Sequence, residues 1–253
     1  MSIQKAQAIV LRSIKFRETS LITSFFTAEF GKIKAISKGV RAEKSMLTAQ
    51  YEPFTQVEII FYEKIKSDIH FLSECSLVYF FSKIRNDFEK IGWASYLMEL
   101  TDAVLPVHEK NSKLFALLLE VLRRMEEGSP SRLVNIFELK LLQEIGFFPR
   151  LESCIRCGKE DAGGTLSLSL AEGGMICVKC RRYSEEYFPV AQGLVKMMQY
   201  LAENEPAKGL QLTASREMEE EIHRLVYRWV KFRYERDLSA FRFLREVDLI
   251  RQF

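Results

Sequence analysis

Hydrophobic and polar residues alternate along the first part of the chain, as they do in strands with one buried face. Between residues 7 and 75, short segments rich in β-branched and aromatic residues are separated by Gly31, Gly39 and the polar stretch 37–45. The predicted strands span residues 7–16, 20–27, 31–37, 54–64 and 69–75. Five strands in about 70 residues is the size of a small closed barrel, of which the OB fold is the common nucleic-acid-binding example. Periodicity alone leaves an SH3-like barrel open.

After Ser76 the apolar residues recur at spacings of three and four, which is typical of helices. The predicted helices span residues 77–91, 93–105, 112–127, 131–145, 191–204 and 213–238. Their Leu- and Phe-rich faces favour the inside of a helical bundle. The predicted fold class is therefore α+β, with a five-stranded OB-fold barrel over residues 1–75 and a helical domain over residues 76–253. A cysteine-rich lobe is inserted in the helical domain at about residues 150–183.

The cysteine-rich lobe carries two Cys-x-x-Cys pairs, formed by Cys154 with Cys157 and by Cys177 with Cys180. This spacing is that of a zinc ribbon, in which two tight turns each point two thiolates at one ion and complete a tetrahedron. Residues 165–170 alternate between turn signals and predict a strand of a small hairpin. A lobe this small has little core of its own, so a bound metal would supply much of its folding free energy.

Other uses of four cysteines are less well supported. A thioredoxin-like site needs only one pair in a βαβ setting, and a catalytic zinc site keeps an open position and usually includes His. An iron–sulfur cluster also takes four thiolates and stays open. We expect structural Zn²⁺ at Cys154, Cys157, Cys177 and Cys180, and a small buried hydrophobe at Cys75.

Composition points to an ordinary globular chain of 253 residues, with 47% hydrophobic residues, 28% charged residues and a net charge of +3. No apolar run approaches the roughly 20 residues of a membrane span, and the first residues do not resemble a signal peptide. We therefore expect a cytoplasmic protein without membrane contact. Thiols stay reduced in that compartment, so paired cysteines indicate metal or redox chemistry rather than a structural disulfide.

Catalytic motifs are not evident in the sequence. It contains no Walker A, GxGxxG, GxSxG or HExxH pattern, and His70, His108 and His223 lie in separate parts of the chain. Each histidine is expected on the surface or in a satisfied structural position. We therefore expect no enzyme and no catalytic residue.

Positive charge is concentrated at the start of the chain, where residues 1–50 hold nine Lys and Arg against three acidic residues. A strand edge and glycine-containing loop with this charge can follow a phosphate backbone. The candidate DNA-binding residues are Lys32, Lys34, Lys38, Arg41 and Lys44. Nearby Phe25, Phe26 and Phe30 either stack on bases or fill the core, and the sequence leaves this choice open.

A second group of cations lies on the last long predicted helix. Arg224, Arg228 and Lys231 share one face, because residues three and four apart stack on a helix. We rank them second as DNA-binding candidates.

The sequence blocks AIVLRSIKFRETSLI, EFGKIKAISKGVRAEKS, YEPFTQVEIIFYE, YFFSKIRNDFEKIGWASYLMELTDAVLP, LFALLLEVLR, FELKLLQEIGFFPRLESCIRCG and CVKC follow one another along the chain. Together they resemble the RecO family of bacterial recombination-repair proteins. The block FELKLLQEIGFFP, which leads directly into the first cysteines, is the most distinctive. The resemblance implies an N-terminal OB fold, a helical body, a zinc-binding lobe, and an accessory protein rather than an enzyme.

The resemblance also implies a function in DNA repair and recombination after DNA damage. RecO-like proteins bind single- and double-stranded DNA, anneal complementary strands, and work with RecR to help RecA replace single-stranded-DNA-binding protein (SSB). The basic strand and loop of the family's OB fold match the five N-terminal candidate cations given above. A zinc-ribbon adaptor that contacts only proteins, and a metal-dependent nuclease, are the alternatives from other classes.

Overall fold

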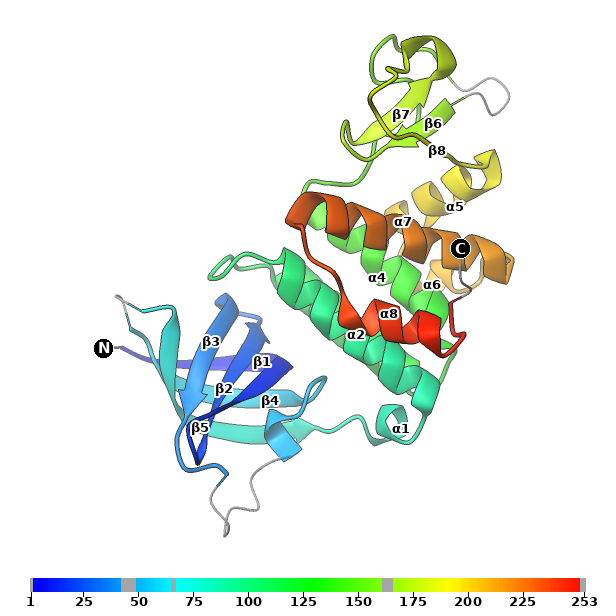
Figure 1. Ribbon diagram of the computed structural model, residues 1–253. Coiled ribbons are helices and arrows are strands. Elements are labelled where there is room, and N and C mark those ends of the chain that lie inside the picture. Colours follow the sequence, from blue (N-terminus) through cyan, green and yellow to red (C-terminus); the bar gives the residue numbers. More distant parts are fainter. Residues whose placement is uncertain (1, 42–48, 65–66, 161–165, 251–253) are drawn as a thin grey trace. The chain divides into compact units, whose positions relative to one another are not determined.

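The computed structural model describes residues 2–41, 49–64, 67–160 and 166–250 (Figure 1). The N-terminal strands are β1 (Ile3–Phe16), β2 (Ser20–Thr27), β3 (Gly31–Ser37), β4 (Gln56–Tyr62) and β5 (Ile69–Tyr79). They close into a barrel of order β1-β2-β3-β5-β4, in which β3 and β5 run parallel and the other pairs are antiparallel. This is the five-stranded OB arrangement, so the predicted fold class is confirmed.

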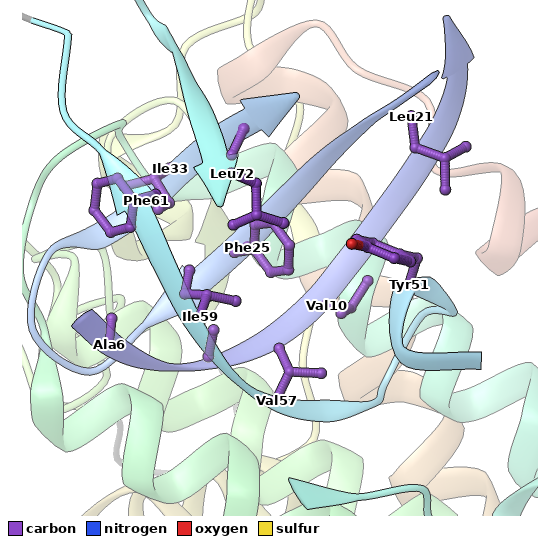
Figure 2. Close-up of a cluster of buried hydrophobic side chains, with 12 residues drawn as sticks. Ala6, Val10, Leu21, Phe25, Ile33, Tyr51, Val57, Ile59, Phe61 and Leu72 are labelled. Carbon is purple, nitrogen blue, oxygen red and sulfur yellow. The ribbon is translucent and has the colours of Figure 1, made fainter. Parts of the chain in front are cut away.

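The barrel interior is filled by alternate residues of its strands, as the period of two requires. Val10, Phe25, Ile33, Ile59 and Phe61 are almost completely buried and point toward one another in Figure 2. The short 3-10 helix Ala49–Tyr51 places the ring of Tyr51 at one end of this cluster.

Three helices follow the barrel, and one returns to them from the end of the chain. They are α1 (Ser82–Arg85), α2 (Phe88–Val104), α3 (Ser112–Met125) and α8 (Ser239–Glu246). Asp87 and Asn111 cap α2 and α3, since their side chains accept hydrogen bonds from backbone N–H groups in the first turn. The predicted helix 77–91 is wrong at its start, because β5 continues to Tyr79 and pairs with β4 there, across a β-bulge.

Asp102 of α2 joins the helix to three strands of the barrel. Its carboxylate lies 2.9 Å from Nε of Arg12 on β1 and accepts a 3.1 Å hydrogen bond from Oγ of Ser24 on β2. Lys32 of β3 donates from Nζ to the Asp102 carbonyl at 2.6 Å, with the carboxylate 3.7 Å away. Asp102 and Lys32 are both buried, so this wall of the barrel is closed by α2.

The α2–α3 connection adds to the same side of the barrel. Val107 forms a β-bridge with Lys32, and the N–H of His108 donates to the Lys32 carbonyl at 2.9 Å. A Cβ at Gly31, whose φ is +66°, would lie 2.0 Å from the carbonyl oxygen of Glu109. Only glycine fits at this point of contact.

Arg85 fastens α1 to the loop before β4. Its guanidinium lies over the rings of Phe54 and Phe80, at 4.4 and 4.0 Å from their centroids. It also forms a 2.9 Å ion pair with Glu52 and donates to Oγ1 of Thr55 at 2.7 Å. Such stacked, multiply bonded arrangements suit the planar guanidinium of arginine and not lysine.

The chain divides into two compact units, one of residues 1–130 and 238–253, the other of residues 131–237. The boundary predicted at residue 75 falls inside β5, and the helices α1, α2, α3 and α8 are grouped with the barrel. Glu99 of α2 explains the return of α8, because its carboxylate accepts from the N–H groups of Ser239 and Ala240.

The second unit contains helices and a small sheet. The helices are α4 (Pro130–Glu144), α5 (Gln192–Glu203), α6 (Pro206–Gly209) and α7 (Arg216–Tyr234), and the strands are β6 (Leu166–Ser169), β7 (Gly174–Cys177) and β8 (Phe188–Pro189). The predicted helix 213–238 ends at Tyr234, because Glu235 adopts a left-handed conformation with φ of 51°. Across the described residues, no helix is long and apolar enough to cross a membrane.

Replacing Asp102 with Ala should destabilise the first unit by about 3 kcal/mol, because it leaves the buried ammonium of Lys32 without its carboxylate. Urea unfolding measures this change. Glu120→Ala is the matched control, since its ion pair with Arg124 is about 40% exposed and should contribute less than about 1 kcal/mol. The double variant Lys32→Met/Asp102→Ala should recover part of the loss, and equal unfolding of the single and double variants would contradict the assignment.

Candidate nucleic-acid interface and metal centre

The predicted DNA-binding residues of the barrel are distributed over two different surfaces. Lys32 is only 7% exposed and its ammonium is held by Asp102, so its position does not fit a phosphate contact. Strand alternation placed Lys32 and Lys34 correctly on one face of β3, but α2 covers that face at Lys32. Lys34 lies further along the strand, half-buried, opposite Ser24 of β2 and Ile69 of β5.

Lys38 and Arg41 lie where the chain leaves β3. Lys38 is exposed, with its ammonium 5.5 Å from the ring centroid of Phe71 on β5. Arg41 folds back on the β1–β2 turn, since its N–H donates to the Thr19 carbonyl at 3.0 Å and its guanidinium to the Arg17 carbonyl at 3.4 Å. Lys44 lies outside the described residues.

A hollow of about 670 Å³ opens at this end of the barrel. It is lined by Phe16, Arg17, Glu18, Thr19, Ser20, Ile36 and Lys38. Arg17 is exposed, has a φ of 54°, and lies over the Phe16 ring at 5.3 Å. Cations beside half-buried aromatic rings form the kind of surface on which single strands bind. We call the residues Phe16, Arg17, Lys38, Arg41 and Phe71 the barrel-end surface.

Sequence reasoning missed Arg17 and Phe16. Their signal was the KFRETS turn between two predicted strands, where a cation and an aromatic ring flank the bend. No local pattern marks this turn as a binding site, because it lies beside Lys38 only in the folded barrel.

The three phenylalanines whose role the sequence left open pack in the hydrophobic core. Phe25 points into the barrel, and Phe26, on the opposite face of β2, packs 5.7 Å from the Phe115 ring of α3. Phe30 lies 5.5 Å from Phe61 and is partly buried against the barrel core. Phe25 and Phe26 are fully buried and therefore cannot stack on bases.

The cysteine lobe brings its four sulfur atoms together. The Sγ atoms of Cys154, Cys157, Cys177 and Cys180 all lie within 4.8 Å of one another, and those of Cys157 and Cys177 are 3.7 Å apart. A tetrahedral ion with 2.3 Å metal–sulfur bonds requires sulfur atoms about 3.8 Å apart. The four cysteines could therefore hold one metal ion.

Local backbone geometry creates this cluster. The N–H of Cys154 donates to the Lys159 carbonyl, and the N–H of Gly158 donates back to the Cys154 carbonyl, each at 2.8 Å. Gly158 has a φ of +73°, which closes the turn that aims the first two thiols at the same point. The second pair comes from the end of β7 and the 3-10 helix Val178–Cys180 that follows it.

The pKa shifts of the clustered cysteine thiols agree with a site for a cation. Burial raises the pKa of Cys154, but backbone hydrogen bonds, led by those involving Cys177 and Cys157, bring it down to about 6. Hydrogen bonds with the Cys157 and Cys177 thiols raise the pKa of Cys180 to about 12, because neighbouring thiolates oppose a further negative charge. A divalent cation at the centre would remove this repulsion. Cys75 belongs to the barrel, and burial raises the pKa of its thiol to about 12.

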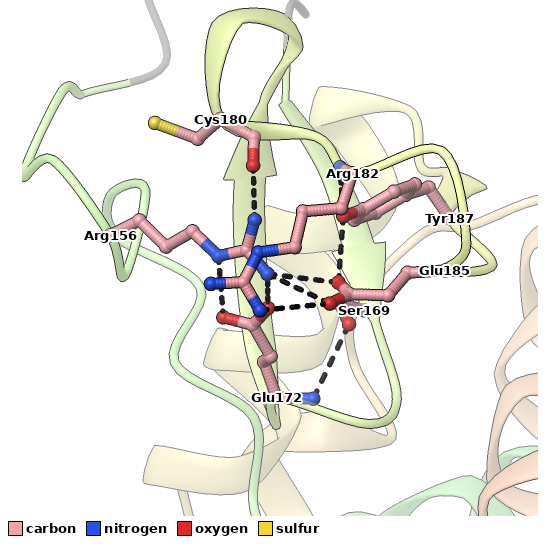
Figure 3. Close-up of polar contacts among 7 residues, drawn as sticks. All are labelled: Arg156, Ser169, Glu172, Cys180, Arg182, Glu185 and Tyr187. Carbon is pink, nitrogen blue, oxygen red and sulfur yellow. Dashed lines mark hydrogen bonds and ion pairs between the residues drawn. The ribbon is translucent and has the colours of Figure 1, made fainter.

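Arg156 holds the lobe together beside the cysteines (Figure 3). Its guanidinium forms ion pairs with Glu172 and Glu185 and donates to the Cys180 carbonyl. The Tyr187 hydroxyl donates to Glu185 at 2.7 Å and, together with Arg156, lowers the pKa of that carboxyl. The positive charge of Arg156 is thus compensated by carboxylates inside the lobe.

The second-ranked cations of α7 separate into two groups. Arg224 is mostly buried and paired with Glu221 at 2.6 Å, so its charge is compensated. Arg228 lies over the Phe188 ring at 4.8 Å, and Lys231 is exposed one turn further on. Both line a hollow of about 690 Å³, together with Phe188 and Phe232.

The histidines occupy structural positions. His223 of α7 is fully buried, and its Nδ1 lies 2.7 Å from the Glu138 carboxylate of α4. His70 stacks on Phe61 and lies 5.2 Å from His108, and burial followed by the charge of His108 lowers the pKa of His70. The sequence did not predict that His70 and His108 would meet.

Comparison with known proteins matches both halves of the chain. The family model described as the N-terminal part of recombination protein O covers residues 1–81, and the model of its C-terminal part covers residues 85–240. The chain belongs to the RecO family. The resemblance inferred from the sequence is therefore confirmed, and so is a role in DNA repair and recombination.

Curated relatives cover nearly the whole chain. The DNA repair protein RecO of Pelotomaculum thermopropionicum is 32% identical over 96% of this chain and 94% of its own length. RecO of Acetivibrio thermocellus is 26% identical over 99% of this chain and 100% of its own length. RecO of an Anaeromyxobacter strain is 30% identical over 96% of this chain and 96% of its own length. The RecO family model of the N-terminal part ends at residue 81, beside the end of β5.

Replacing Cys154 with Ser should remove the metal ion from the lobe, because three thiolates leave one tetrahedral position empty. Elemental analysis of the purified protein should find about one metal ion per native chain and far less in the variant. Cys75→Ser is the matched control and should keep the ion, since Cys75 lies in the barrel. Equal metal content in all three proteins would contradict the assignment of the site.

Proposed function

We propose that this protein is a non-enzymatic accessory factor of recombinational DNA repair that binds single- and double-stranded DNA and anneals complementary strands. With RecR, it helps RecA replace SSB on exposed single strands. Membership of the RecO family supports this role, and one observation carries its assignment to residues. That observation is the hollow at the barrel end, which Lys38 lines together with Arg17 and the ring of Phe16 beneath it.

The mechanism is electrostatic. Two DNA strands repel each other through their phosphates, and cations that neutralise these phosphates release bound counterions and let the strands approach. The barrel-end surface supplies Arg17, Lys38 and Arg41 from two adjacent segments that hydrogen bonds hold together. The half-buried rings of Phe16 and Phe71 offer planar surfaces for bases, so bases could remain exposed for pairing on their other edges. No nucleotide cofactor and no catalytic residue takes part.

The metal in the lobe is proposed to be Zn²⁺ with a structural role. Four thiolates at tetrahedral spacing leave no open coordination position, which is typical of structural zinc. Iron bound by the same four cysteines would give the purified protein visible absorption, so metal analysis together with an absorption spectrum distinguishes the two.

The double variant Arg17→Ala/Lys38→Ala should weaken binding to oligonucleotides of all sequences alike. The log–log dependence of affinity on salt should flatten by about 1.4, because each single-strand phosphate that the protein no longer neutralises reduces the slope by about 0.7. Titrations of a fluorescent oligonucleotide at several salt concentrations measure this slope. An unchanged slope would remove the barrel-end surface from the DNA interface.

Lys110→Ala/Lys113→Ala is the matched control, because it removes the same charge from the other end of β3. Lys110 follows Glu109, whose carbonyl contacts Gly31 at the start of that strand. Lys38 follows its end, about 20 Å away. The control should leave the slope unchanged, whereas an equal flattening would mean that only total charge matters.

Annealing of complementary oligonucleotides coated with SSB, with and without RecR, tests the biological step. We expect annealing without added nucleotide and no cleavage of labelled strands in magnesium or manganese. Salt-insensitive behaviour with no affinity for oligonucleotides would instead favour a zinc-ribbon adaptor that contacts only proteins.

A further inference from the structure

The cysteine lobe presents a loop with an unusual side chain at its tip. Tyr183 is fully exposed, and among the described residues none forms a hydrogen bond or ring contact with its side chain. An aromatic ring is costly to leave entirely in water, because it gains about as much from burial as any side chain. A ring in this position suits contact with another molecule.

The loop that carries Tyr183 is held firmly on both sides of it. The N–H of Arg182 donates to the Tyr187 hydroxyl at 2.8 Å, and that hydroxyl donates to the Glu185 carboxylate at 2.7 Å (Figure 3). Glu185 is in turn paired with Arg156, next to the cysteines. Tyr183 therefore projects from a braced turn, so a ligand would not have to order the loop on binding.

The segment that leads to Tyr183 is positively charged, and Glu185 and Glu186 follow it. Between residues 178 and 184 the sequence VKCRRYS contains three cations and no acidic residue. Lys179 and Arg182 are exposed, and Arg181 lies over the Tyr187 ring at 5.5 Å. The only other exposed apolar residue in this stretch is Val178. Within residues 178–184, a peptide anchored on Tyr183 would find only Val178 as further exposed apolar surface, whereas a nucleic acid offers phosphates to the cations and flat bases to the ring.

A hollow begins at the next residue and continues the same chemistry. Ser184, Glu186 and Phe188 line it on the lobe side, with Arg228, Lys231 and Phe232 of α7. Phe232 is 54% exposed, and the guanidinium of Arg228 lies over the Phe188 ring. Glu185 and Glu186 also line the hollow, and Glu185 is paired with Arg156, so the two cations of α7 face one further carboxylate. A strand leaving Tyr183 would therefore meet further aromatic rings and cations.

We propose that residues 178–188 and this hollow form a second single-stranded DNA contact, in which Tyr183 stacks on a base and Lys179, Arg181 and Arg182 lie along the phosphates. The inference rests on the proposed function and extends it. It assigns to the cysteine lobe a strand-binding role beyond folding. One chain then holds a strand contact on each of its two compact units, which is what bringing two strands together requires.

Tyr183→Ala in the full-length, metal-loaded protein tests this contact. Stacking of one base on an aromatic ring corresponds to a loss of about ten-fold in affinity on alanine substitution, measured here with a fluorescent oligothymidylate. Tyr183→Phe keeps the ring and should bind within about two-fold of the native protein. Tyr200→Ala, which removes an exposed tyrosine of α5 outside the hollow, should change nothing.

A cross-linking experiment locates the contact directly. Oligonucleotides containing 4-thiothymidine should cross-link to the peptide that includes Tyr183 on irradiation, and mass spectrometry identifies that peptide. Metal content and thermal unfolding of Tyr183→Ala should match the native protein, because no described residue depends on this side chain for a hydrogen bond.

The outcomes separate the inference from the function on which it rests. If Tyr183→Ala binds like the native protein while Arg17→Ala/Lys38→Ala loses affinity, the lobe contact is wrong and the barrel interface stands. If the native protein binds no oligonucleotide at all, both are wrong. If Tyr183→Ala keeps its DNA affinity but loses a protein partner, the exposed ring is a protein contact and the inference is overturned.

Discussion

A single buried carboxylate determines which part of the barrel is available to a ligand. Asp102 of α2 is bonded by side chains from β1, β2 and β3, so the helix is fixed across one wall of the barrel. A buried charge of this kind is tolerated only when its partners are all present, which makes the arrangement selective for one placement of the helix. The Lys32 ammonium is bonded to Asp102 in this arrangement, and α2 covers the neighbouring face of β2. The far end of β3, where the barrel-end surface lies, remains exposed.

The cysteine lobe is also fixed by a few polar groups, which here are four thiols and an arginine. Its four thiols close on one point, and Arg156 joins both sides of the lobe through Glu172 and Glu185. A segment with few apolar residues thus acquires a fixed shape and can present an exposed loop. A metal held by these thiols would act on the fold and would leave the residues outside the site available for binding. In both units, paired charges build the structure, and further cations lie exposed on the surface.

Much of this organisation could be predicted from the sequence, and the failures have physical causes. Alternation located all five barrel strands, and spacing located the cysteines, because both signals depend only on near neighbours in the chain. Lys32 was assigned to the DNA-binding set because alternation gives the face of a strand but not what covers that face. Arg224 was assigned for the same reason on a helix, where Glu221 compensates it. Arg17 was not among the candidates, because it lines the same hollow as Lys38 only in the folded barrel. The return of α8 to α2 depends on Glu99, a contact across 140 residues that no local pattern reveals.

Hydrogen exchange measured by mass spectrometry, with and without saturating single-stranded DNA, tests the central claim most directly. The claim is that DNA meets the barrel at the end that Asp102 leaves open. Bound DNA should slow exchange in residues 16–20 and 36–41 and leave the exposed connection 105–111, at the other end of β3, unchanged. Slower exchange in residues 105–111, with residues 16–20 unaffected, would contradict this account.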